Sequence, residues 1–182
     1  MPYTKAVASE AHVGEVGARF AEVGDSFTRP ANTTAYASGD LVANSTTAGS
    51  VAPLEFPVGR IEGGNGAVQS VTLRSNRTGL SAGSPPANAS FRLHLYRASP
   101  TPANGDNDAW LTDQGDDYLA SIDVSMDRAF NDGAAGTAVA SPEIPFDLPA
   151  GETTIYGLLE ARAAYTPASA EVLEVELRVR QN

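Results

Sequence analysis

The chain has 182 residues, of which 42% are hydrophobic and 19% charged, a length and composition typical of one folded domain with its own core. Its formal net charge of -10 argues against nucleic acid and anionic membranes as partners, because both are bound through lysine and arginine. The absence of cysteine excludes disulfides, a thiolate nucleophile and cysteine-ligated zinc.

The first 24 residues differ from the rest of the chain in the spacing of their apolar residues. Val13, Val16 and Phe20 lie at a helix-like spacing, but the glycines among them weaken any helix. The segment lacks the charged head and apolar run of a signal peptide, and no stretch approaches the roughly 20 apolar residues that span a bilayer. We therefore expect residues 1–24 to form an N-terminal arm, extended or a short helix, of a protein made in the cytoplasm.

From residue 25 onward, short alternating apolar runs indicate β-strands. Residues 89–97 predict a central strand, with Phe91, Leu93 and Leu95 on the core face and His94 on the polar face. In the segment 54–58, a proline predicts an edge strand, because proline cannot donate to the ladder. The other candidates, in chain order, are 26–31, 40–43, 68–74, 118–124, 144–148, 153–165 and 172–180.

These eight or nine strands, joined by turn-rich connections and without a long helical pattern, predict an all-β fold. We expect residues 25–182 to form a single antiparallel β-sandwich domain. A jelly-roll-like sandwich is favoured because the strand count fits and the long loop 99–115 suits a crossing between sheets. An immunoglobulin-type sandwich is the alternative.

The most concentrated polar cluster lies in the acidic loop, residues 104–117. Asp106, Asp108 and Asp113 are candidate calcium ligands, because calcium prefers six to eight oxygen ligands. The spacing lacks the glutamate that closes an EF-hand loop, and Asp, Asn and Gly are also the ordinary residues of turns. A solvated loop is therefore the alternative to a calcium site, and no other cofactor is expected.

No residue pattern indicates catalysis. The two histidines, His12 and His94, lie far apart in the chain, and no nucleophile elbow supports a Ser-His-Asp triad. Glu174 and Glu176 look like the outward face of a strand rather than the paired carboxylates of a glycosidase. We expect Trp110, the single tryptophan, to cap one end of the sandwich or to lie in a subunit contact. The chain is therefore expected not to be an enzyme.

Two stretches, DSFTRPANTTAYASGDLVAN at residues 25–44 and TTIYGLLEARAAYTPASAE at residues 153–171, resemble a group of tailed-bacteriophage and prophage proteins encoded among virion structural genes. The resemblance covers roughly residues 25–182 and brings no catalytic motif with it. It implies a virion component, and a small, acidic, cysteine-free β-sandwich is most similar to a capsid decoration (cement) protein.

A decoration protein of this kind implies the major capsid protein as partner, self-association as a trimer, and a place on the outer surface of the phage head. Tyr3, Val13, Val16 and Phe20 give the arm apolar side chains for docking onto a neighbouring subunit, with a disordered tail as the alternative. Two other functions stay open: a tail- or fibre-associated module that binds a host glycan through Trp110, Tyr118 and the acidic loop, and a polysaccharide hydrolase.

Overall fold

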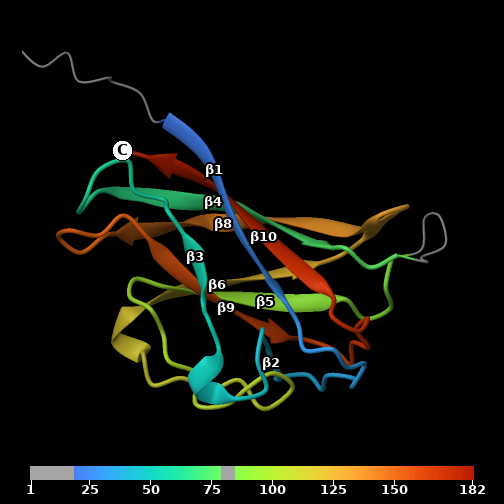
Figure 1. The fold of residues 1–182 in the computed structure, drawn as a ribbon. Helices are drawn as coiled ribbons and strands as arrows, with labels where there is room; N and C mark the ends of the chain where they lie inside the picture. The colour runs from blue at the N-terminus through green and yellow to red at the C-terminus, as the bar shows by residue number, and fades with distance from the viewer. Residues whose placement is uncertain (1–18, 79–84) are drawn as a thin grey trace, which may run out of the picture.

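Ten β-strands in two antiparallel sheets make up the computed structural model, which describes residues 19–78 and 85–182 (Figure 1). The first sheet has the order β1-β10-β4-β8-β7, and its members are β1 (Arg19–Thr28), β4 (Asn65–Ser75), β7 (Arg128–Phe130), β8 (Gly133–Asp147) and β10 (Val172–Gln181). The second has the order β2-β9-β5-β6, with β3 also paired to β9; its members are β2 (Leu41–Val42), β3 (Leu54–Phe56), β5 (Ser90–Tyr96), β6 (Tyr118–Ser125) and β9 (Ile155–Ala161).

The predicted all-β sandwich is confirmed, while the jelly-roll form stays a prediction. Two short 3₁₀ turns, Ala48–Ser50 and Gly115–Asp117, are the only helical elements in the described part of the chain. Within those same residues no helix is long and apolar enough to cross a membrane.

The core lies between the sheets and is built from apolar side chains on their inward faces, with the clearest alternation on β10. On β10, Leu173, Val175, Leu177 and Val179 are fully buried, while the residues between them are partly or fully exposed. On β5, the predicted core residues Phe91, Leu93 and Leu95 are fully buried as well. An alternating strand buries one face and leaves the other to water, which is why the sequence located these strands.

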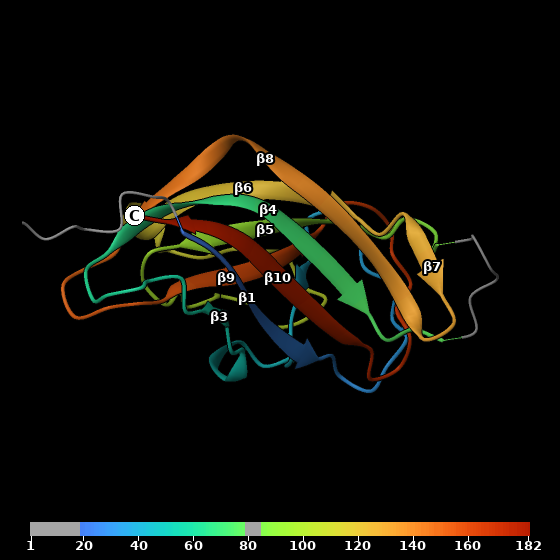
Figure 2. The ribbon, with the colours of Figure 1, turned by 90° about the horizontal axis from the view of Figure 1, so that it is seen from above.

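The last two strands lie in different sheets. β9 pairs with β2, β3 and β5, whereas β10 pairs with β1 and β4. The connection of residues 162–171 therefore passes from one layer to the other. Figure 2 shows β1, β10, β4 and β8 side by side across the first sheet.

The predicted arm boundary at residue 24 falls inside a strand. Arg19 to Gly24 belong to β1 and pair in register with β10, from Arg19 opposite Gln181 to Gly24 opposite Glu176. Phe20 is thus a strand residue of the first sheet. Residues 1–18 of the predicted arm lie outside the described residues.

Candidate functional site

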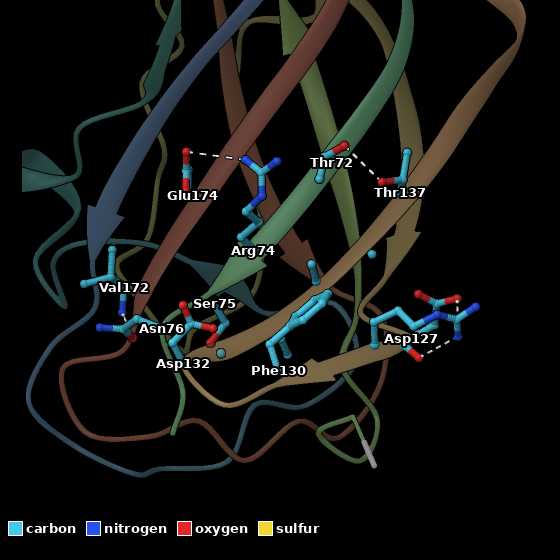
Figure 3. A pocket seen from close by; sticks show the side chains of 15 residues that line it. Thr72, Arg74, Ser75, Asn76, Asp127, Phe130, Asp132, Thr137, Val172 and Glu174 are labelled. Atoms are coloured by element: carbon cyan, nitrogen blue, oxygen red, sulfur yellow. Dashed lines mark hydrogen bonds and ion pairs between the residues drawn. The ribbon is translucent and has the colours of Figure 1, made fainter. Parts of the chain in front are cut away.

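A hollow of about 700 Å³ lies on the outer face of the first sheet, over β4, β8 and β7 (Figure 3). We call it the outer-face hollow. It arises because long and short side chains alternate across the strands. Arg74 on β4 pairs with Ala135 on β8, and Ala135 pairs with Arg128 on β7, so a methyl group lies between two guanidinium side chains. Two residues along the hairpin, Phe130 pairs with Gly133, which lies against the backbone of Ser75.

The walls of the outer-face hollow carry an aromatic ring and polar groups of both signs. The ring of Phe130 is 55% exposed. Arg74 Nη1 lies 3.2 Å from a carboxylate oxygen of Glu176 and 3.6 Å from one of Glu174. The hydroxyls of Thr72 and Thr137 are hydrogen-bonded to each other at 3.0 Å. The site can therefore offer an apolar surface, hydrogen-bond donors and acceptors at once.

The predicted calcium ligand Asp106 lies in a buried cluster with Arg29 and Tyr36, which we call the Asp106 cluster. Arg29 Nη2 donates to Asp106 Oδ2 at 3.1 Å, and both side chains are completely buried. Asp106 Oδ1 accepts hydrogen bonds from the Tyr36 hydroxyl at 2.6 Å and from the Ala43 backbone N–H at 2.9 Å. Burial, and next the hydrogen bond and charge of Asp106, raise the pKa of Tyr36 well above its usual value. Both carboxylate oxygens of Asp106 thus already have partners within the chain.

The other two predicted calcium ligands do not join this cluster. Asp108 is exposed and contributes its backbone carbonyl to the Leu41 N–H at 2.7 Å. The Asp113 side chain accepts a hydrogen bond from its neighbour Gln114 at 3.4 Å. Within residues 19–78 and 85–182, no three His, Cys, Asp or Glu side chains form a metal-binding group. Calcium binding by the acidic loop stays a prediction. Asp106 is the least accessible of the three predicted ligands, because both of its carboxylate oxygens are buried and hydrogen-bonded.

His94 is buried, although the sequence placed it on a polar face. Trp110, from the loop after β5, stacks on the imidazole with ring centroids 3.9 Å apart. His94 Nε2 lies 2.8 Å from Glu160 Oε2, and Nδ1 lies 3.3 Å from the Tyr118 hydroxyl. The other carboxylate oxygen of Glu160 accepts from Arg162 Nη1 at 2.8 Å. One face of the Trp110 ring is therefore occupied by an internal contact.

Burial lowers the pKa of His94, and the hydrogen bond and charge of Glu160 oppose that shift without overcoming it; the cations Arg92 and Arg162 add to the lowering. The unfolded chain therefore takes up a proton first as the pH falls through the ordinary imidazole pKa of about 6.5. We expect the free energy of unfolding to decrease as the pH is lowered from 7 to 5.5. Urea unfolding followed by Trp110 fluorescence measures this directly. In the variant His94→Gln the free energy of unfolding should change less between these pH values. An identical pH dependence in the two proteins would contradict the assignment of this effect to His94.

Of the residues predicted to dock onto a partner, Tyr3, Val13 and Val16 lie outside the described residues. Phe20 lies at the start of β1 with its ring 52% exposed, and the guanidinium carbon of Arg178 is 5.6 Å from the ring centroid. Its role in partner binding stays a prediction.

Sequence reasoning missed the outer-face hollow. The first half of β8 is rich in alanine and glycine, and β7 has only three residues, so neither carries the alternating apolar signal of a strand. The available signal was the run of small residues at 133–136, which begins three positions after Phe130.

Comparison of the chain with known proteins finds no matching protein family and no matching curated protein.

Proposed function

We propose that this protein is a non-enzymatic structural component of a phage virion, a head decoration protein that binds the assembled capsid and stabilises it. The proposal starts from the resemblance of residues 25–44 and 153–171 to proteins encoded among virion structural genes. The partners are the major capsid protein and further copies of this chain, most simply three. Neither nucleic acid nor membrane is a partner.

One observation lends this proposal its main support: the two resembling stretches pack against each other. The Tyr36 N–H donates to the Tyr165 carbonyl at 2.9 Å, and the Gly39 N–H donates to the Ala161 carbonyl at 2.8 Å. β2, from the first stretch, pairs with β9, from the second, and the Tyr36 and Tyr165 rings stack. The two stretches, more than a hundred residues apart in the sequence, thus form one structural unit.

That unit is held by buried polar contacts. Arg29 of the first stretch joins Asp106, and its backbone N–H donates to the Glu171 carbonyl at 3.0 Å. Glu171 in turn accepts hydrogen bonds from the Tyr165 hydroxyl at 2.6 Å and from the Ser75 hydroxyl. Fully satisfied buried networks make a local structure rigid and unique. A rigid domain suits a protein that acts by binding to a shell.

The proposal is tested on virus particles from which the gene has been deleted. We expect such particles to release their DNA at a lower temperature than complete particles, because the shell loses contacts that resist internal pressure. Adding back the purified protein should restore the release temperature. Equal release temperatures for the two kinds of particle would contradict head decoration and favour a place in the tail.

A further inference from the structure

We propose that the outer-face hollow is a binding site for a neutral saccharide, taking one or two pyranose rings of a glycan. The inference goes beyond the proposed role on the capsid and does not rest on it, because the hollow is built entirely from residues of one chain.

The shape of the hollow fits a ligand of this size. Small-molecule sites commonly have volumes of roughly 300–1,000 Å³, and the outer-face hollow, at about 700 Å³, lies within that range. The small side chain of Ala135 leaves the space, and the exposed Phe130 stands beside it. Figure 3 shows this ring lying over β8, with Arg74 on one side and Asp127 on the other. An aromatic face is electron-rich, so it attracts the weakly positive C–H groups of a pyranose face.

The charges around the hollow favour a neutral ligand. Its lining contains two guanidinium groups, from Arg74 and Arg128, and three carboxylates, from Asp127, Asp132 and Glu174. Arg74 lies 3.6 Å from Glu174 and Arg128 lies 3.5 Å from Asp127, so both cations are already paired. The hollow therefore has no concentrated positive charge that would attract a phosphate and no concentrated negative charge that would attract a metal ion.

The hydrogen-bonding groups match those of sugar hydroxyls, each of which both donates and accepts. Asp132 is exposed and makes no hydrogen bond or ion pair with the other residues that the structure describes. Asn76 uses its side-chain oxygen to accept from the Val172 N–H at 2.9 Å, which leaves its amide nitrogen able to donate. Thr72 and Thr137 share one hydrogen bond and keep further capacity.

The aromatic residues predicted for glycan binding fit this role less well. Trp110 stacks on His94, and the ring of Tyr118 packs edge-on against Tyr96 at 5.4 Å. Neither residue lines the outer-face hollow. Phe130 is the aromatic side chain that this hollow presents to solvent.

The test uses saturation-transfer NMR on the full-length protein with four neutral disaccharides at millimolar concentration: maltose, cellobiose, lactose and N,N′-diacetylchitobiose. We expect at least one to bind, and the variant Phe130→Ala to weaken that binding at least tenfold. The matched control is Phe20→Ala, which removes a ring of similar exposure from the same sheet and should leave the affinity unchanged. The anionic sugar N-acetylneuraminic acid should bind more weakly than the best neutral disaccharide.

Two results would overturn the proposal. One is no saturation transfer to any of the four disaccharides. The other is binding that Phe130→Ala leaves intact, which would place the sugar elsewhere on the molecule. Circular dichroism of Phe130→Ala shows whether the variant is folded, and Asp132→Asn provides a second variant at the rim if it is not.

Discussion

Replacing Leu93 with aspartate is expected to abolish the folded state. Leu93 lies on β5 between Ile122 of β6 and Leu159 of β9, and its side chain is completely buried in the core between the sheets. An aspartate there would place an unpaired charge among apolar side chains, a change that destabilises a protein by more than about 4 kcal/mol. Domains of this kind are typically stable by about 5–15 kcal/mol, so most or all of the stability is lost. Thermal unfolding followed by circular dichroism measures the effect.

The control for this substitution is Val139→Asp, which makes the same kind of change where the side chain is 75% exposed. It should shift the transition little, because the new carboxylate stays in water. An unchanged transition in Leu93→Asp would mean that this face of β5 does not form the core.

The substitution Asp106→Asn is expected to destabilise the domain by about 3–5 kcal/mol, the usual consequence of breaking a buried ion pair by removing one partner. Asparagine keeps the shape and can still accept from Tyr36 and Ala43, so the loss comes from the uncompensated charge of Arg29. Urea unfolding at pH 7 gives the free energy directly.

The neighbouring substitution Asp108→Asn supplies the comparison. Asp108 is exposed, and the hydrogen bonds found for it run through its backbone. It should leave stability within about 0.5 kcal/mol of the wild type, as surface changes usually do. Equal effects of the two substitutions would contradict a structural role specific to Asp106.

The strands that the sequence revealed are those in which apolar core residues alternate with polar residues along the chain. β5, β6 and β10 alternate because their core side must be apolar, and this alternation can be recognised from the local sequence alone. Most of β8 was not predicted from the sequence. Its inward positions include the small residues Ala134, Gly136 and Ala138, which give no apolar alternation. The start of β1 at Arg19 was not predicted either, because the glycines and the helix-like spacing of the apolar residues there do not indicate a strand that pairs with β10.

The polar sites depend on contacts far apart in the chain, which local patterns do not contain. Asp106 meets Arg29, 77 residues earlier, and the sequence shows only an aspartate in an acidic loop. His94 is buried because Trp110 folds back over the outer side of β5, so an expected exposed face has become an internal one. The outer-face hollow likewise depends on the register of three strands.

Binding to a phage head can be measured by co-sedimentation of the purified protein with empty shells of its cognate major capsid protein. The measurement is made with and without a chelator, so that it also tests calcium binding by the acidic loop. We expect saturable binding at a fixed ratio of protein to shell. Protein that stays in the supernatant at every shell concentration, with and without added calcium, would contradict it.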